Sequence, residues 1–312
     1  MHYSPSVRLG YISVCSAALL WAASGNASKF LLQSEVTPFQ LVQLRTTLAA
    51  AFLFLFLLVR RRDLLKTARS DVMYFIMLGI VLAVMLFAYL YAISRIHVAA
   101  AVLLQYQAPA LIALYSLFSR RVTLSVFTLL AIVGALIGCY LMVGAYNLNI
   151  LDMNKAGILS GLGSAVALAV YSVRSEYGMR TYSAWTVLSY ALLVAAIIWN
   201  VIIPPFAAFT VKYSASAWGW IVFISLVGTV APFGLYSEGI KRIGSTHSSI
   251  TATLEPVMAG VIAYVLLGEV MELPQLIGAG TVIGAILLLP MEELRAAGVH
   301  EQHRGPKDQQ KR

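Results

Sequence analysis

The chain has 312 residues, of which 60% are hydrophobic and only 11% are charged, and its mean hydropathy is +0.82. A soluble protein carries about a quarter charged residues, so this composition excludes a soluble globular protein and predicts an integral membrane protein. The formal net charge of +9 does not indicate a nucleic-acid partner, because the basic residues are spread over short polar segments and the C-terminal tail.

The apolar residues form long continuous runs separated by short polar connections. A helix that crosses the bilayer needs about 20 apolar residues, whereas a membrane β-barrel shows alternating strands of roughly ten residues. Runs such as AAAFLFLFLLV do not alternate, so the pattern excludes a barrel. In chain order we expect membrane-spanning helices at residues 10–32, 38–59, 72–94, 97–119, 123–144, 156–176, 184–203, 216–240, 244–267 and 274–291.

The distribution of Lys and Arg predicts how these helices are oriented. If the N-terminus is cytoplasmic, most basic residues outside the spans fall on the cytoplasmic side, and the other side holds only Lys29, Arg95, Lys155 and Lys212. Cytoplasmic loops of membrane proteins carry an excess of Lys and Arg. We therefore expect a multi-pass protein of the cell membrane with both termini in the cytoplasm.

An internal repeat relates the two halves of the chain at a shift of 147 residues. The matches are GYIS on GILS (10–13 and 157–160), Arg95-Ile96 on Arg242-Ile243, and Pro109 on Pro256. Each half holds five spans, an odd number, so the second half enters the membrane from the opposite side. This predicts an all-α integral membrane fold of ten transmembrane helices, arranged as two inverted-topology five-helix repeats with a substrate site between them. The expected parts are a first repeat at 1–144, a connecting loop at 145–155, a second repeat at 156–291 and a disordered cytoplasmic tail at 292–312.

Two prolines lie at equivalent depths in the fourth and ninth spans. Pro109 belongs to LLQYQAPALIALY and Pro256 to TATLEPVMAGVIAY. A proline inside a helix has no N–H for the carbonyl four residues earlier, here the carbonyls of Gln105 and Ala252. Such freed groups are tolerated in a membrane only against protein or a water-filled cavity, so both helices should face inward. We expect Pro109 and Pro256 to act as hinges, with Pro232 in the eighth span as a third.

Small residues recur in the fifth and tenth spans. With a shift one residue shorter, GALIG at 134–138 falls on GTVIG at 280–284. Each segment holds two glycines four residues apart, a spacing that lets membrane helices approach closely. We therefore expect Gly134, Gly138, Gly280 and Gly284 to serve helix packing.

The sequence also resembles the EamA-type transporters of the drug/metabolite transporter superfamily, over about residues 8–291. The resemblance rests on the two five-span halves, on Trp21 and Arg45, on YQAP in the fourth span, and on LEP followed by LLGE and GAGTVIG near the end. It implies ten spans, a central cavity and ATP-independent export of small metabolites, often amino acids. One departure is Arg120-Arg121, because family members often carry a Glu at the end of the fourth span.

Glu255 is the strongest candidate for a functional side chain. A charged side chain within the bilayer costs about 2.5–3.5 kcal/mol on insertion scales. Glu255 could bind a substrate amine or carry a coupling proton, or it could be a structural acid bonded to a neighbouring helix. Thr251, one helical turn earlier, either completes a polar patch or bonds to its own helix. In the first half we prefer Gln105 to Gln107 for the substrate site, because Gln105 shares a face with Pro109.

Three aromatic residues and an arginine complete the expected substrate site. Tyr89 and Tyr236 correspond at the 147-residue shift and could stack on a substrate, although packing or an interfacial position is the commoner role of such residues. Trp21, together with Asn26 and Tyr171, is a weaker candidate for the cavity. Arg45 could attract a carboxylate substrate, pair with an inward acid, or snorkel to the outer surface. We assign Glu269 to a span boundary.

Two other classes of function stand beside a secondary transporter of amino acids or similar metabolites. A channel or lipid scramblase of the same architecture has less need of an inverted repeat with matched prolines. An intramembrane enzyme is disfavoured, because the sequence has no HExxH motif, no CxxC spacing and no phosphate-binding loop. Cys15 and Cys139 indicate no disulfide framework or metal site, so we expect no cofactor. The expected partners are a small-molecule substrate and the lipid bilayer, and both a monomer and a homodimer are open.

Overall fold

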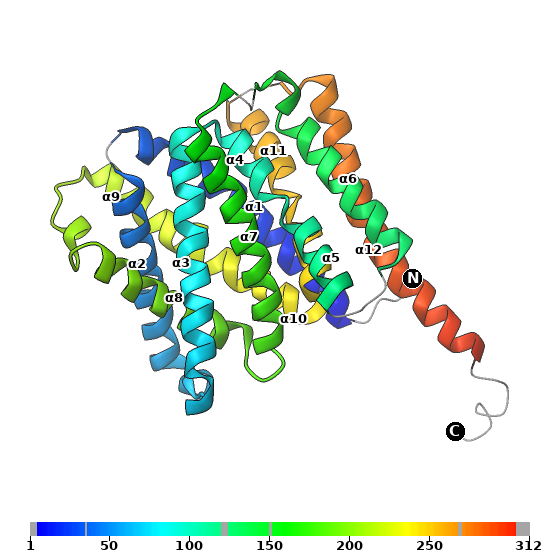
Figure 1. Cartoon of the computed structure of the whole chain (residues 1–312), viewed down its shortest axis with the longest axis horizontal. Helices are drawn as coiled ribbons and strands as arrows, with labels where there is room; N and C mark the ends of the chain where they lie inside the picture. The colour runs from blue at the N-terminus through cyan, green and yellow to red at the C-terminus, as the bar shows by residue number, and fades with distance from the viewer. Residues whose placement is uncertain (1–4, 35, 120–123, 150–151, 268–269, 304–312) are drawn as a thin grey trace.

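The computed structural model describes residues 5–34, 36–119, 124–149, 152–267 and 270–303. Every regular element in these ranges is a helix, and no strand occurs among them, in agreement with the all-α fold predicted from the apolar runs. The helices lie side by side in one bundle (Figure 1). The departure at Arg120-Arg121 and the predicted boundary residue Glu269 fall outside the described residues.

The first half of the chain forms long helices joined by short 3₁₀ turns. In chain order these are α1 (Pro5–Ser34), α2 (Pro38–Arg60), η1 (Arg62–Leu65), η2 (Arg69–Asp71), α3 (Val72–Arg95), α4 (Val98–Gln105), α5 (Ala108–Ser119), α6 (Val126–Met142) and η3 (Ala145–Asn147). The start of α2 is fixed by a capping box. Thr37 Oγ1 accepts from the Gln40 N–H at 3.3 Å, and Gln40 Oε1 accepts from the Thr37 N–H at 2.9 Å.

The second half repeats this pattern with one irregular turn. Its elements are α7 (Lys155–Gly178), α8 (Ala184–Ile202), η5 (Ala207–Phe209), α9 (Ala215–Ser225), η6 (Leu226–Val230), α10 (Ala231–Ala252), α11 (Glu255–Leu267) and α12 (Leu273–His303). Of these, η6 is a turn of π-helix, a conformation that is frequent at functional sites. Helix α12 continues beyond residue 291 to His303, so 292–303 are helical where the sequence predicts the start of a disordered tail.

Within the described part of the chain, eight helical segments are long and apolar enough to cross a membrane, and two shorter apolar helices, Val126–Met142 and Glu255–Val265, accompany them. The fourth and ninth predicted spans are not continuous helices. The fourth is divided into α4 and α5, and the ninth is divided between the end of α10 and α11. The eighth and ninth spans are instead joined within α10, which bends at Gly244 because this residue has a φ of 78°.

The patterns aligned by the 147-residue shift lie against each other crosswise. Gly10 of α1 faces Arg242 and Ile243 of α10, so closely that an added Cβ would be 2.9 and 2.8 Å from their side chains. Its counterpart Gly157 of α7 faces Arg95 and Ile96, where the same distances are 2.9 and 2.7 Å. Each half therefore packs its first helix on the same dipeptide of the other half.

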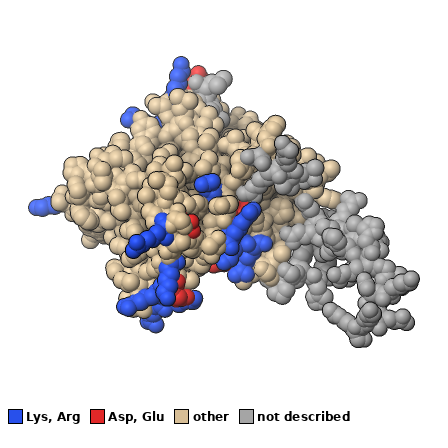
Figure 2. Space-filling model, turned by 60° about the horizontal axis from the view of Figure 1, so that its bottom comes forward, with Lys and Arg blue, Asp and Glu red and all other residues tan. Residues whose placement is uncertain are grey.

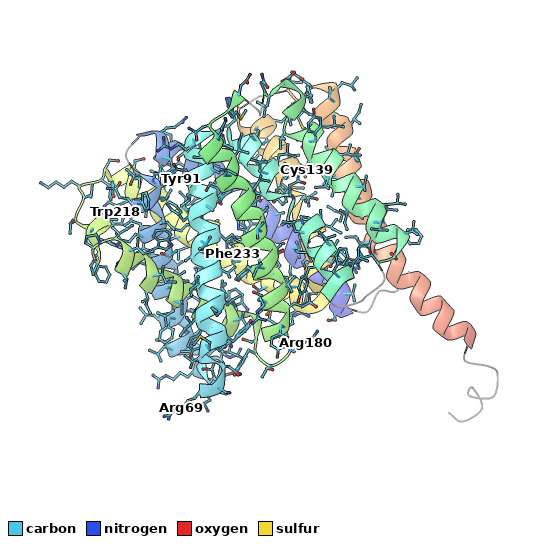
Figure 3. The ribbon with its side chains drawn as sticks, viewed as in Figure 1. Arg69, Tyr91, Cys139, Arg180, Trp218 and Phe233 are labelled. Carbon is cyan, nitrogen blue, oxygen red and sulfur yellow. The ribbon has the colours of Figure 1, made fainter. Side chains whose placement is uncertain are left out.

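The basic side chains gather at one end of the bundle. Arg69 and Arg180 lie there, whereas Tyr91 and Cys139 lie toward the other end (Figure 3). Figure 2 brings this end forward and shows Lys and Arg over it with few acidic residues. We call it the basic face; it carries η1, η2 and the turn between α7 and α8. The opposite end carries η3 and the junction of α3 and α4, and we call it the η3 face.

Only some of the four glycines predicted to serve helix packing lie where α6 contacts α12. An added Cβ on Gly138 would be 2.7 Å from Val282 Cγ2 and 2.9 Å from the carbonyl oxygen of Gly278. Gly280 and Gly284 have no such neighbour within 4 Å. The prediction for Gly280 and Gly284 is therefore wrong, because α12 turns the face with Gly278 toward α6.

Candidate functional site

The two broken spans meet at the centre of the bundle. Pro109 is the second residue of α5 and Pro256 the second residue of α11, and each follows a two-residue turn. The hydroxyl of Tyr106, in the first of these turns, donates to the carbonyl of Ala252 at 3.0 Å. This is the carbonyl that Pro256 leaves without an N–H. The expectation that the freed carbonyl turns inward against protein is confirmed.

Glu255 begins α11 and therefore does not lie in the middle of a helix. Its Oε2 is 2.6 Å from the hydroxyl of Tyr106, and its side chain is half-buried. The first N–H groups of a helix have no partner within the helix and carry partial positive charge, which favours a carboxylate at this position. The helix break thus provides for Glu255 an environment that a continuous membrane helix lacks.

Tyr106 faces two acceptors with a single hydrogen. When Glu255 is ionised, the hydroxyl donates to its carboxylate at the shorter distance, and the Ala252 carbonyl is left without that hydrogen. When Glu255 is protonated, the acid can donate to the Tyr106 oxygen while Tyr106 donates to Ala252. When Glu255 carries a proton, both the Tyr106 oxygen and the Ala252 carbonyl oxygen can therefore accept a hydrogen bond.

Arg45 of α2 is buried, with 5% of its side chain exposed, and it is held by the π-helical turn η6. Its Nε donates to Thr229 Oγ1 at 2.6 Å and its Nη2 donates to the Gly228 carbonyl at 3.0 Å. Arg45 therefore does not snorkel to the surface in this structure, and its guanidinium points inward, to the central cavity and η6.

Pro232 explains why the Gly228 carbonyl is available. In a regular α-helix this carbonyl would accept a hydrogen bond from the N–H of residue 232, but proline has no N–H. The predicted hinge residue Pro232 is the second residue of α10, which begins directly after the end of η6, and it is buried. It thus contributes to the site through the backbone, by leaving an acceptor for Arg45.

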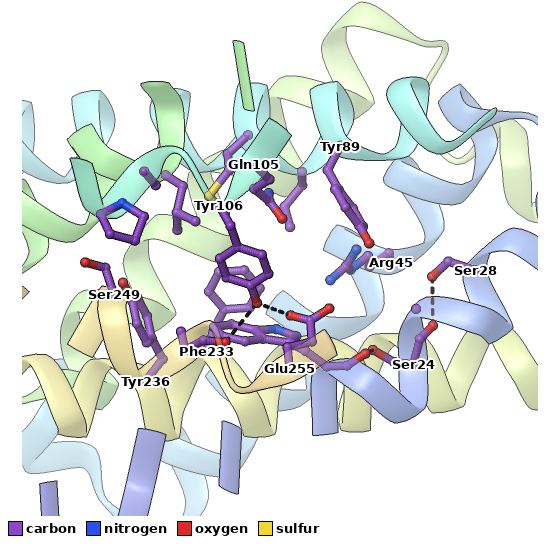
Figure 4. A pocket seen from close by; sticks show the side chains of 18 residues that line it. Ser24, Ser28, Arg45, Tyr89, Gln105, Tyr106, Phe233, Tyr236, Ser249 and Glu255 are labelled. Carbon is purple, nitrogen blue, oxygen red and sulfur yellow. Dashed lines mark hydrogen bonds between the residues drawn. The ribbon is translucent and has the colours of Figure 1, made fainter. Parts of the chain in front are cut away.

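A central cavity with about 700 Å³ of empty space lies between these elements (Figure 4). Arg45, Tyr89, Gln105 and Glu255 all line it, as predicted. The full lining is Trp21, Ser24, Gly25, Ser28, Arg45, Met85, Leu86, Tyr89, Gln105, Tyr106, Ala108, Pro109, Leu168, Phe233, Tyr236, Ser249, Ala252 and Glu255. Acid, base and aromatic side chains from both halves of the chain are thereby brought to one space.

A second cavity, which we call the vestibule, has about 1010 Å³ of empty space and adjoins the first. The two share Gly25, Tyr89 and Glu255. The vestibule extends toward the η3 face, where Val98 and Gln275 line it. Glu255 consequently stands at the boundary between the central cavity and a passage to one end of the bundle.

Aromatic side chains form one wall of the central cavity. The ring of Trp21 lies 5.1 Å from that of Phe233 and 5.4 Å from that of Tyr236. The Tyr236 hydroxyl lies 2.9 Å from Ser172 Oγ, so its polar end points away from the ring contacts. Trp21 and Tyr236 therefore both line the central cavity, where their rings also pack against Phe233 or each other.

Thr251 does not line either cavity. It is fully buried, and its hydroxyl donates to the carbonyl of His247 in its own helix at 2.8 Å. The assignment of Thr251 to the substrate site is therefore wrong, and the alternative of a bond within the helix is correct.

Sequence reasoning misses Tyr106, which has the shortest contact with Glu255. The sequence favours the preceding residue, Gln105, because on a regular helix it shares a face with Pro109. The helix ends at Gln105, however, so Tyr106 in the turn can reach α11 while Gln105 still lines the cavity. Ser24 and Ser28, also on the cavity wall, carry no signal beyond their small size. Among the described residues, no group of three or more His, Cys, Asp or Glu side chains could hold a metal ion.

Known proteins resemble the whole chain. The model of the EamA-like transporter family matches residues 8–144 and again residues 155–291. YicL of Salmonella typhimurium, an uncharacterized inner membrane transporter, is 26% identical over 298 residues, 94% of this chain and 98% of that protein. The threonine/homoserine exporter RhtA of Escherichia coli K12 is 24% identical over 250 residues, 78% of each chain. An uncharacterized transporter of Archaeoglobus fulgidus is 33% identical over 202 residues, 64% of this chain and 70% of that protein.

The fold also recurs among solved structures. One crystal structure superposes with a TM-score of 0.74 at 22% sequence identity, covering 95% of this chain and 99% of that one. Together with the apolar helices and the transporter relatives, the family match over both halves identifies a multi-pass membrane transporter. The chain belongs to the EamA-like transporter family.

Proposed function

We propose that this protein is a secondary transporter that moves small zwitterionic metabolites, foremost amino acids, by alternating access around the central cavity. The observation that carries the proposal is the pairing of charges in that cavity. Arg45 from the first half and Glu255 from the second half line the same space, and neither is neutralised by a salt bridge with another described residue. A ligand with a carboxylate and an amine complements both.

Both side chains keep hydrogen-bonding atoms available for a ligand of this class. Arg45 donates from Nε and Nη2 to η6, and no described residue accepts from its Nη1. Glu255 uses one oxygen for Tyr106 and has the other for a ligand. The relatives named RhtA are threonine/homoserine exporters, which favours amino acids without fixing the substrate.

Ten spans in two inverted five-helix repeats are the architecture that we propose around this cavity. The repeat is supported by the crosswise packing of Gly10 and Gly157 and by the double match of the family model. The paired breaks after Gln105 and Ala252 support it as well, because equivalent spans open at equivalent depths. In such repeats the two halves rock about a fixed site near the midplane.

The orientation and the coupling complete the proposal. We assign the basic face to the cytoplasm by the excess of Lys and Arg that it carries, so the vestibule opens outward. A proton on Glu255 and a substrate amine compete for one carboxylate. Competition of this kind would couple export of the metabolite to entry of a proton.

Counterflow into proteoliposomes tests the proposal. Proteoliposomes that contain the purified protein and are loaded with unlabelled threonine are expected to take up radiolabelled threonine saturably. Competition by a panel of other amino acids, sugars and nucleosides then defines the substrate class. Glu255→Gln should abolish the pH dependence of this exchange, whereas Asp63→Asn, an exposed carboxylate at the basic face, should not. Non-saturable flux, or scrambling of labelled lipid, would instead support a channel or scramblase.

A further inference from the structure

Buried hydroxyl groups without partners are concentrated between α7 and α10. Tyr171 and Ser175 of α7, and Ser237 and Ser248 of α10, are each fully buried, and their side-chain oxygens have no hydrogen-bond partner among the described residues. Ser175 and Ser237 lie beside the Tyr171 hydroxyl, but none of the three reaches hydrogen-bond geometry with another. Ser248 lies apart from these three, beside Gly239 where α10 packs on α1, so we call Tyr171, Ser175 and Ser237 alone the hydroxyl column.

Such a cluster is costly if it serves only to hold the fold together. A buried polar group without a hydrogen-bond partner destabilises a protein, and an apolar side chain of the same shape would avoid this cost. Scattered exceptions occur in most proteins, but here they face one another across two helices that contact each other. The arrangement indicates a second conformation in which the hydroxyls meet water or a ligand.

The column connects the central cavity with the basic face. At its inner end, Tyr236 lines the cavity and contacts Ser172, the neighbour of Tyr171 on α7. At the end nearest the basic face, the Glu176 carboxylate accepts from the backbone N–H of Ser245 at 3.0 Å and from the Ser245 hydroxyl. Polar groups are thus present on α7 and α10 both beside the central cavity and near the basic face, with the hydroxyl column between them.

The internal repeat gives an independent reason to assign these positions to the substrate path. At the shift of 147 residues, Tyr171, Ser172 and Ser175 correspond to Ser24, Gly25 and Ser28. All three of the latter line the central cavity, on the side that communicates with the vestibule through Gly25. The first repeat therefore lines the central cavity at these helix positions, whereas in the second repeat Tyr171, Ser172 and Ser175 line neither cavity.

We propose that Tyr171, Ser172, Ser175 and Ser237 line the cytoplasmic half of the substrate path, where they bind water and the polar groups of a small zwitterionic ligand once the basic face opens. This inference rests on the proposed function. It extends the site beyond the cavity, because exchanging the conformations of the two repeats turns the α7 positions into the lining that α1 provides now.

At the basic face, Gly10 packs on Arg242 and Ile243. At the η3 face, the matching contact of Gly157 with Arg95 and Ile96 is equally close although the vestibule extends toward that face, so both contacts hold the two halves together in the state observed. Because a Cβ at either glycine would come within 3 Å of its neighbours, a valine there acts as a wedge. Gly10→Val should favour opening at the basic face, and Gly157→Val opening at the η3 face.

Labelling of single cysteines tests the proposal without knowledge of the substrate. In a Cys15→Ser, Cys139→Ala background, the purified full-length protein in detergent carries Ser175→Cys, Ser237→Cys, Ser28→Cys or Ser189→Cys. The rate of reaction with a charged methanethiosulfonate is followed by intact mass. Ser189 is the matched control, since it is a buried serine without a partner on α8, outside the proposed path.

We expect Gly10→Val to raise the labelling rates at positions 175 and 237 about ten-fold and to lower the rate at position 28. Gly157→Val should have the opposite effects. The reason is that overpacking by a valine shifts the equilibrium between the two conformations. Without a wedge, positions 175 and 237 should still react faster than 189, which keeps the test valid if a wedge variant does not fold. Equal rates at 175, 237 and 189, or equal acceleration at all four positions, would overturn the inference. Saturable counterflow by the same protein would then leave the proposed function standing.

Discussion

At the scale of single residues, the contact between Tyr106 and Glu255 joins the two halves of the chain. Tyr106 reaches a carbonyl and a carboxylate that belong to the same break in the ninth span. One hydroxyl therefore stabilises the freed backbone of Ala252 and adjusts to the protonation of Glu255. This double role distinguishes Tyr106 from the other aromatic residues on the cavity wall.

Tyr106→Phe should lower both stability and transport. The change leaves the Ala252 carbonyl without a donor inside the protein, which costs about 1–3 kcal/mol. It also deprives Glu255 of its hydrogen bond, so the pH at which exchange is half-maximal should shift. Thermal unfolding in detergent and counterflow across a pH series measure the two effects. Tyr140→Phe, at a ring exposed on α6, is the control and should change neither.

Arg45→Lys should not preserve function although it preserves charge. The guanidinium bonds Thr229 and the Gly228 carbonyl with two separate nitrogens, and a single ammonium cannot reproduce this fork. We expect counterflow of threonine to fall by at least about ten-fold, through loss of the group that fixes the substrate carboxylate. A lysine variant with unchanged affinity would contradict the assignment of Arg45 to the substrate site.

At the scale of secondary-structure elements, irregular turns rather than regular helices provide the polar groups of the site. The break before α11 exposes the Ala252 carbonyl, and η6 with Pro232 exposes the Gly228 carbonyl. In both cases a proline removes an N–H and a side chain from the other half of the chain supplies the replacement. The cavity is thereby held by bonds that cross between the halves.

Pro232→Ala separates this role from simple helix stability. Alanine restores an N–H that competes with Arg45 for the Gly228 carbonyl, and it is a far better helix former than proline. The melting temperature should be unchanged or higher, whereas the affinity for threonine should fall because Arg45 loses a fixed position. A lower melting temperature together with normal affinity would show that Pro232 serves the fold alone.

The packing of α6 on α12 gives a second test at this scale. Gly138→Val adds a side chain whose Cβ would lie within 3 Å of the Gly278 carbonyl oxygen and of Val282 Cγ2. This overpacking should destabilise the protein by about 1–3 kcal/mol. Gly284→Val adds the same groups where nothing lies within 4 Å and should be neutral. Thermal unfolding of the two variants in one detergent compares them directly.

At the scale of the whole molecule, the sequence predicts what depends on local pattern and leaves open what depends on contacts. Apolar runs locate the helices, and the position of Pro256 alone is enough to identify the Ala252 carbonyl as freed. The partners of that carbonyl and of Arg45 come from distant segments, Tyr106 and η6, so no local pattern names them. The assignment of Thr251 to the site fails for the complementary reason, since a threonine can satisfy itself within its own helix.

The orientation that we propose for the whole molecule rests on the excess of Lys and Arg at its basic face, and it is open to a direct test. Cytoplasmic assignment of the basic face places both chain ends in the cytoplasm and η3 outside the cell. Alkaline phosphatase, which is active only outside the cytoplasm, should be inactive when fused to the C-terminus and active when fused after Asn147. Green fluorescent protein at the same two positions should give the opposite result. Activity of the C-terminal phosphatase fusion would reverse the orientation and, with it, the direction in which the vestibule opens.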